Sequence, residues 1–202
     1  MRSRIGDDMK LMLDGACQMR NWADALEVGL ACDATGCLWY EDPYRDLGVS
    51  AMGHQRLREK IRTPLLVSEQ VRGLEQKANF LLAGGCDILH ADPEYDMGIT
   101  GVMKIAHLAE ALGLDVQLHA CGPAQRAAMS AIRNTQLYEL ALIGPGMPNL
   151  IPPVYTCGYS DQMDAVGGDG CVSVPGGPGL GVTYDWEFIE ANRTAYHEYV
   201  KD

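Results

Sequence analysis

Six ionisable residues recur along the chain at intervals close to the length of one strand-and-helix unit. Five close short apolar segments and the sixth lies inside another; they are Asp14, Glu41, Glu69, Asp92, His119 and Glu139. Successive members are 27, 28, 23, 27 and 20 residues apart. A single carboxylate at a strand end is more often a helix cap or a solvated loop residue. Six in register instead predict one edge where catalytic groups meet, as at the carboxyl end of a parallel barrel.

The first three of these residues indicate a metal site. Asp14, Glu41 and Glu69 are carboxylates at the ends of three consecutive units, and they would repel one another unless a cation neutralised them. Oxygen ligands without cysteine or histidine favour Mg²⁺ or Mn²⁺ over zinc. Mg²⁺ also keeps positions open for water or for a substrate oxygen. The sequence therefore predicts a Mg²⁺ site at these three residues, with Mn²⁺ as the alternative ion.

The next two residues indicate acid-base chemistry. Asp92 and His119 end neighbouring strand segments, so the carboxylate can orient the imidazole and stabilise its protonated form. Taken alone, His119 would be interpreted as a hydrogen-bonded core residue. His90 shares the strand parity of Asp92 and is a candidate to support the site from within the strand. A structural interpretation is favoured for the other histidines, which are His54, His107 and His197.

Strand-like apolar runs alternate with amphipathic helical patterns through the first part of the chain. The expected strands cover residues 10–14, 38–41, 65–69, 87–92, 115–119 and 137–142. The clearest helical patterns cover residues 22–35, 99–112 and 123–133. In the first pattern Trp22, Leu26 and Leu30 form an apolar stripe between a cap at Asn21 and a stop at Gly36. This alternation predicts crossover units on a parallel sheet, which is an α/β fold.

The end of the chain breaks this rhythm. Residues 143–202 hold six of the ten prolines and ten of the 23 glycines. A hairpin is expected within residues 164–175 and a closing helix at 186–199. We therefore expect a barrel part at residues 1–142 and a Gly/Pro-rich tail at 143–202 that packs on it.

Composition excludes several classes of protein. The 202 residues are 47% hydrophobic and carry a net charge of −11, which fits a globular chain and disfavours nucleic acid and anionic membranes as partners. Seven cysteines without a C-x-x-C spacing indicate reduced thiols and a cytoplasmic location. The longest uncharged stretch, residues 140–160, contains four prolines that would break a membrane helix. The usual nucleotide-binding glycine motifs are absent.

An ordered set of short motifs resembles one enzyme family. The matching segments are residues 11–14, 39–43, 68–69, 87–100 with Gly-Ile-Thr at its end, 115–119, 177–181 and 184–186. In this order they resemble the carboxyl-terminal barrel portion of a mandelate racemase-like member of the enolase superfamily, in the mandelate racemase/muconate lactonizing enzyme family. The likeness covers nearly all of the chain.

The resemblance implies a partial (β/α)7β barrel of the TIM type. About six of its eight strands would be present, equivalent to the third through the eighth, and the amino-terminal capping domain would be absent. The chain is thus expected to be a fragment of a longer parent. The resemblance also implies Mg²⁺ on Asp14, Glu41 and Glu69, a dyad of Asp92 and His119, and a Glu139 that helps to stabilise the substrate carboxylate.

The implied activity is Mg²⁺-dependent removal of the proton next to a carboxylate, through an enediolate. Dehydration of an acid sugar, a 2,3-dihydroxy acid, is the first expectation, because one His-Asp dyad can remove the proton and serve the departing hydroxyl. A racemase or epimerase of a 2-hydroxy acid is the alternative, and a non-catalytic truncated fragment is another. The expected partner is a small hydroxy-carboxylate, and the full-length parent is expected to be a homo-oligomer.

Overall fold

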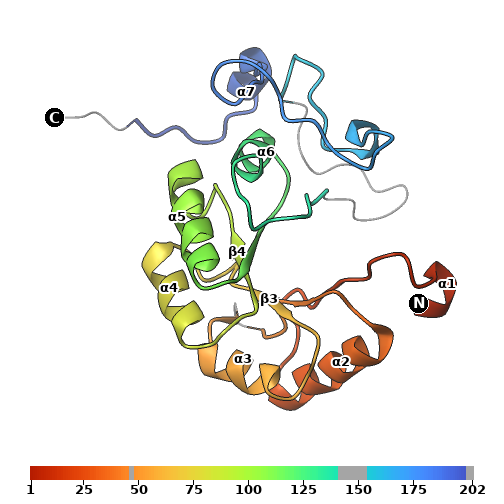
Figure 1. Ribbon diagram of the computed structural model, residues 1–202. Coiled ribbons are helices and arrows are strands. Elements are labelled where there is room, and N and C mark those ends of the chain that lie inside the picture. Colours follow the sequence, from red (N-terminus) through yellow and green to blue (C-terminus); the bar gives the residue numbers. More distant parts are fainter. Residues whose placement is uncertain (46–47, 141–153, 199–202) are drawn as a thin grey trace.

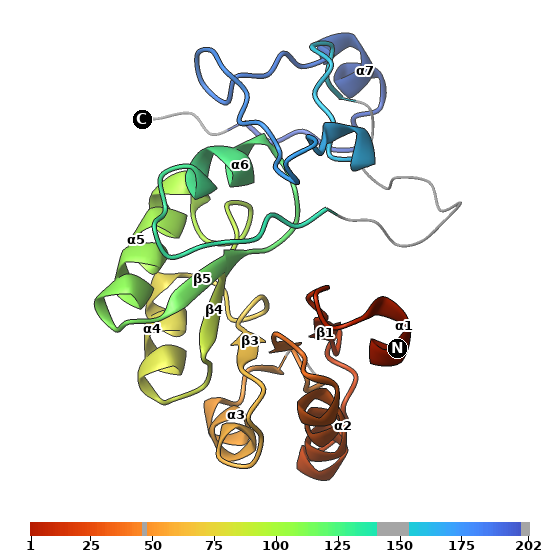
Figure 2. The same ribbon diagram turned by 45° about the vertical axis from the view of Figure 1, so that its right-hand side comes forward.

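The computed structural model describes residues 1–45, 48–140 and 154–198 (Figure 1). Its centre is a parallel sheet with the strand order β1-β2-β3-β4-β5. The strands are β1 (Leu13–Asp14), β2 (Tyr40–Glu41), β3 (Leu65–Val67), β4 (Ile88–Ala91) and β5 (Asp115–Leu118). Helices follow the strands and form an arc outside the curved sheet, so the α/β prediction is confirmed (Figure 2). The sheet does not close into a barrel within the described residues.

The helices begin and end where local chemistry predicts. They are α1 (Arg2–Ile5), α2 (Trp22–Thr35), α3 (Ala51–Arg58), α4 (Leu74–Leu82), α5 (Gly98–Ala111), α6 (Pro123–Met129), the 3₁₀ turn η2 (Met163–Ala165) and α7 (Trp186–Ala191). The Asn21 side chain caps α2 by accepting hydrogen bonds from Ala23 and Asp24, at 2.9 and 3.0 Å. Gly36 ends this helix at φ 64°, a conformation that glycine adopts without steric cost.

The buried face of α2 differs from the predicted stripe. Leu30 is 50% exposed, whereas Ala25, Gly29 and Cys32 are buried. A side chain at Gly29 would lie 2.9 Å from a methyl carbon of Ile61, so the small residue lets α2 pack closely there. Trp22 and Leu26 pack against the core as the stripe predicts, so only Leu30 departs from it, and small residues are buried beside them.

Alternate strand residues face opposite sides of the sheet. Leu65, Val67 and Leu89 point to the helices and belong to the main apolar core. Leu66 and His90 have the opposite parity and line an interior cavity of about 320 Å³. His90 therefore faces away from the helices, on the side of the sheet where this cavity lies.

The predicted sixth strand is not formed in the described part of its range. Residues 137–140 have no strand pairing, and 141–142 lie outside the described residues. A side-chain hydrogen bond stands where a strand ladder was expected, because Gln117 Nε2 donates to the Leu137 carbonyl at 2.8 Å. Among the described residues the sheet therefore has five strands.

Residues 154–198 lie beside α6 as a loop-rich segment (Figures 1 and 2). Within the predicted hairpin the pairing is one antiparallel bridge, Val166 to Val172, closed by a 2.8 Å bond from Gly167 N to the Cys171 carbonyl. The predicted closing helix is shorter than expected, since α7 ends at Ala191. The boundary predicted between 142 and 143 lies outside the described residues.

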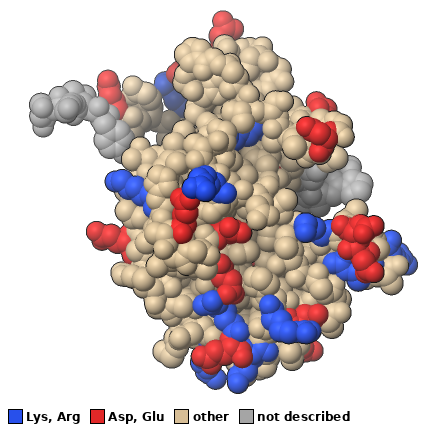
Figure 3. Space-filling model, viewed as in Figure 1, with Lys and Arg blue, Asp and Glu red and all other residues tan. Residues whose placement is uncertain are grey.

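Membrane helices, disulfides and surface charge were also considered in the sequence, and the structure describes each of them. No described helix has the length and apolarity needed to cross a membrane. None of the seven cysteines forms a disulfide. Acidic and basic side chains alternate over the face drawn in Figure 3, which carries no continuous basic patch among its described residues.

Candidate active site

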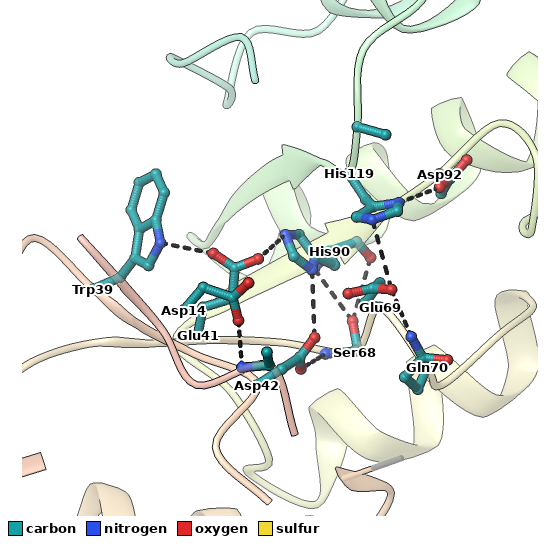
Figure 4. A network of polar contacts seen from close by, with 12 residues as sticks. Asp14, Trp39, Glu41, Asp42, Ser68, Glu69, Gln70, His90, Asp92 and His119 are labelled. Atoms are coloured by element: carbon teal, nitrogen blue, oxygen red, sulfur yellow. Dashed lines mark hydrogen bonds and ion pairs between the residues drawn. The ribbon is translucent and has the colours of Figure 1, made fainter. Parts of the chain in front are cut away.

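The predicted polar residues converge at the carboxyl ends of the strands. Figure 4 shows Asp14, Glu41, Glu69, Asp92 and His119 gathered there. The parallel register explains this convergence, because Asp14 pairs with Glu41 across β1 and β2. The other three residues follow β3, β4 and β5, whose ends lie at the same edge. The structure therefore brings five of the six predicted residues to one edge, which the parallel order of the strands explains.

His119 lies between two carboxylates. Its Nδ1 is 2.6 Å from Asp92 Oδ2, and its Nε2 is 3.6 Å from Glu69 Oε1. The Asp92 side chain is 4% exposed and that of His119 is 25% exposed, so the pair is largely shielded while the imidazole can still be reached. Burial works to lower the pKa of His119, but the Asp92 hydrogen bond and the charges of Glu69 and Glu139 outweigh it and raise the pKa to about 9.

The neighbouring carboxylates are crowded. Burial, followed by the charge of Asp14, raises the pKa of Glu41 to about 8. Burial and the charge of Glu69 raise the pKa of Asp42 to about 7. Glu41 accepts a hydrogen bond from the Trp39 indole at 3.0 Å, but this single donor does not offset the effect of burial and repulsion. Such a cluster holds more negative charge than its own donors can compensate.

A divalent cation fits this cluster. Among the described residues, ligand atoms of Asp42, Glu69 and His90 all lie within 4.8 Å of one another. Asp42 Oδ2 and His90 Nδ1 are buried and have no hydrogen-bond partner in the part of the chain that the structure describes, although they lie 3.9 Å apart. Buried polar atoms normally find a partner, so these two atoms are available to a ligand. The carboxylate oxygens of this group suit Mg²⁺ or Mn²⁺, whereas an imidazole nitrogen such as that of His90 is more typical of transition-metal sites.

The predicted ligand set overlaps with this group at one residue. Glu69 belongs to both sets, Glu41 lies 3.3 Å from His90 Nε2, and Asp14 is exposed at the mouth of the same cavity. Asp14 Oδ1 accepts a 2.6 Å bond from the Ala16 amide, which fixes the turn after β1. Sequence reasoning missed Asp42. The sequence could have indicated Asp42 because it follows Glu41 directly. Alternation along a strand, however, predicts that its side chain lies on the opposite face of the sheet from that of Glu41.

Glu139 lies at the site although residues 137–140 form no strand. Its Oε2 accepts a 2.5 Å bond from the Ala120 amide, directly after His119. Glu139 also lines the interior cavity with Glu41, and its charge contributes to the raised pKa of both Glu41 and His119. The sixth predicted residue is therefore placed at the site by a loop contact instead of by a sixth strand.

Known proteins share this chain's fold and sequence pattern. A family model described as enolase C-terminal domain-like matches residues 1–188. D-gluconate dehydratase of Thermoproteus tenax is 26% identical over 201 residues, covering 96% of this chain and 38% of that protein. N-succinylamino acid racemase of an Amycolatopsis species is 26% identical over 196 residues, covering 96% and 51%. The structure of D-glucarate dehydratase from Agrobacterium tumefaciens, complexed with magnesium, matches with a TM-score of 0.79 and 29% identity, covering 96% and 49%.

These similarities have two consequences. The homologues are enzymes, both acid-sugar dehydratases and a racemase, and magnesium accompanies the fold in a solved relative. The chain spans about half the length, or less, of these proteins.

Proposed function

Because the chain belongs to the enolase C-terminal domain-like family, we propose that it supplies the metal ligands and the acid-base pair of an enzyme that removes the proton next to a carboxylate. The observation that carries this proposal is the 2.6 Å contact of Asp92 with His119, placed beside the carboxylate cluster at the strand ends. All six proposed residues fall in residues 1–142. We further propose that residues 143–202 pack on this part as a tail.

The tail proposal rests on one buried arginine of α6. Arg126 Nη2 donates to Asp161 Oδ1 at 2.6 Å, and Nη1 donates to the Ser173 carbonyl at 3.0 Å. The two side chains of the Arg126–Asp161 pair are each 5% exposed, so the contact is a buried, charge-assisted one. A loop-rich segment held by such a pair can stay ordered with little regular structure of its own.

His119 is proposed to carry the proton. Its Nδ1 is engaged by Asp92, so Nε2 is the atom that would accept a proton from the substrate carbon, once a bound cation offsets the carboxylate charges that raise the pKa of this imidazole. Asp92 keeps the imidazole in this orientation and stabilises its protonated form. Glu139 is proposed to help stabilise the substrate carboxylate by donating a hydrogen bond from its carboxyl group, because it lines the cavity and contacts the amide that follows His119.

Asp14, Glu41 and Glu69 are proposed to hold Mg²⁺, with Asp42 and His90 beside them in the same cluster. When bound, Mg²⁺ supplies positive charge that stabilises the negative charge developing on the substrate carboxylate. Mn²⁺ has compatible ligand preferences and is the alternative ion. The crowding that raises the pKa of Glu41 and Asp42 supports a site that needs such a cation.

Dehydration of an acid sugar is the reaction we favour. His119 takes the α proton, the electron pair of that C–H bond forms the new C=C bond, and the 3-hydroxyl leaves as water with a proton that His119 can return. This choice is supported by the two dehydratases at 26% and 29% identity. Racemisation or epimerisation of a 2-hydroxy acid is the second candidate, supported by the related racemase, and it requires another base on the opposite face of the substrate.

The deciding experiment incubates the whole protein with a library of acid sugars in D₂O containing Mg²⁺. A dehydratase gives a product that has lost one water molecule. A racemase gives substrate that keeps all its hydroxyl groups but carries deuterium in place of the α proton. His119→Asn should abolish both outcomes on its face of the substrate. Deuterium exchange at the parent rate in this variant would show that the dyad is structural. The same incubation with this chain alone tests the remaining alternative, because a chain that gives neither product nor exchange would be a non-catalytic truncated fragment.

A further inference from the structure

A buried ion pair lies directly behind the strand ends that carry Glu69 and Asp92. Lys77 of α4 and Asp96, which precedes α5, approach within 3.5 Å between Nζ and Oδ2. Their side chains are 1% and 0% exposed. Removing two charges from water is costly unless further hydrogen bonds satisfy them, so the surroundings of such a pair indicate what it does.

Lys77 joins the ends of two strands. Its Nζ donates to the Ser68 carbonyl at 2.5 Å and to the His90 carbonyl at 2.8 Å. Ser68 has φ 96°, a region that non-glycine residues rarely occupy, so its conformation must be held by its neighbours. Glu69 follows Ser68 directly, and the direction of its side chain therefore depends on this held turn.

Asp96 fixes the backbone on the other side of the pair. Its Oδ2 accepts a hydrogen bond from the Asp92 amide at 2.9 Å, and its Oδ1 accepts one from the Gly73 amide at 2.8 Å. Gly101 of α5 packs so closely that a side chain there would lie 1.5 Å from the Asp96 carbonyl oxygen. Asp96 is thus locked between the start of α5 and the end of β4.

We propose that Lys77 and Asp96 are positioning residues that set the spacing between Glu69 and Asp92. These are the two carboxylates on either side of His119, at 3.6 and 2.6 Å from its two ring nitrogens. A single buried ion pair thereby fixes the positions of Glu69, a proposed metal ligand, and Asp92, the partner of the proposed base, relative to each other. The inference rests on the proposed function, because it assigns the pair to the same site.

The chain offers a matched control at the opposite ends of the same two strands. Arg58 Nε donates to Asp87 Oδ1 at 2.9 Å, and Asp87 Oδ2 accepts a hydrogen bond from the Leu65 amide at 2.9 Å. This pair also ties β3 to β4, but at their amino ends. A variant of Arg58 should weaken the tie between the strands without displacing the groups around His119.

The test compares Lys77→Met with Arg58→Met in three measurements on this chain. These are the midpoint of thermal unfolding, the affinity for Mg²⁺ by calorimetry, and the NMR signal of the His119 Nδ1 proton that bonds to Asp92. Both variants should lower the midpoint. Lys77→Met should weaken Mg²⁺ binding about 10- to 100-fold, as removal of groups that support metal ligands does, and should shift or remove the His119 signal. Arg58→Met should leave both unchanged.

Each outcome decides the question. If Lys77→Met lowers the midpoint as Arg58→Met does but keeps Mg²⁺ affinity and the His119 signal, the pair is only structural and the proposal is overturned. Should Lys77→Met fail to fold, Asp96→Asn is the second variant, because its amide oxygen still accepts one backbone bond. If the unaltered chain binds no Mg²⁺, the proposed function fails, and the His119 signal alone decides the positioning role.

Discussion

Carboxylates at the two ends of the parallel strands have pKa values shifted in opposite directions. At the amino ends, Asp33 accepts three hydrogen bonds of 2.7–3.0 Å from the Arg62 and Thr63 amides and the Thr63 hydroxyl. Burial works to raise the pKa of Asp33, but these donors outweigh it and lower the pKa. At the carboxyl ends, burial and neighbouring carboxylates raise the pKa values of Glu41 and Asp42 to about 8 and about 7.

This difference indicates that carboxylates at the amino ends stabilise the fold, whereas those at the carboxyl ends belong to the proposed site. Carboxylates that are supplied with donors favour the folded state at neutral pH, whereas carboxylates that crowd one another disfavour it unless a cation binds. In barrels of this kind the carboxyl end carries the chemistry. The molecule therefore places its unfavourable charges at the end where a metal and a substrate would offset them.

The largest expected effect is on turnover, and it compares two aspartates that flank β4. Asp92→Asn should lower kcat in the whole protein by roughly 10³- to 10⁴-fold, because it loses the group that orients and stabilises the His119 imidazolium. Asp87→Asn, at the other end of the same strand, should leave kcat within about twofold. Steady-state kinetics with the acid sugar found by the library experiment measure both. Equal losses of kcat in the two variants would show that the two ends of β4 do not differ in function.

The second effect is on metal affinity. Glu69→Gln should weaken Mg²⁺ binding by more than about 100-fold, since loss of a ligand exceeds the usual cost of losing a supporting group. Asp33→Ala should leave the affinity unchanged, because Asp33 lies at the amino end. Calorimetric titration with MgCl₂ on folded samples checks both variants. Unchanged affinity in Glu69→Gln would exclude this residue as a ligand.

The sequence predicted the parallel sheet and the meeting of Asp92 with His119, but it missed part of the polar cluster. Ionisable residues at a regular interval were sufficient to locate Asp92 and His119, because strand register alone brings them together. The sixth strand was wrong in its described part, because side-chain bonds from Gln117 replace the ladder. Asp42 escaped notice because alternation assigns it to the other face. The buried Lys77 was also missed, because a lysine in a helix is normally interpreted as an exposed residue.

The third effect is on stability at the amino ends. Asp33→Ala leaves three donors without their acceptor and should cost about 1–3 kcal/mol in the free energy of unfolding. For a chain of this size that lowers the midpoint by roughly 2–10 °C. Thermal unfolding followed by circular dichroism measures the change. A matched substitution at the other end, Glu41→Gln, should not lower the midpoint at pH 8, and a loss of similar size there would contradict the comparison.

The smallest expected effect is the dependence of stability on pH in the absence of divalent metal. The pKa of Glu41 rises from its ordinary value of 4.5 to about 8 on folding, so the folded state holds this proton more tightly than the unfolded state. Its contribution to stability is therefore complete below pH 4.5 and is lost as the pH rises toward 8. His119, raised from 6.5 to about 9, adds a loss of the same sign between pH 6.5 and 9.

Glu41→Gln isolates the first contribution from the second. Glutamine cannot ionise, so the variant should be more stable than the unaltered chain at pH 8, with the difference vanishing near pH 4.5. The slope due to His119 is common to both proteins and cancels in the comparison. Denaturant unfolding at pH 4.5, 6.5 and 8 in chelator measures it, and MgCl₂ should raise the stability of the unaltered chain at pH 8. If the variant were less stable at pH 8, Glu41 would be a satisfied structural carboxylate, like Asp33 at the other end.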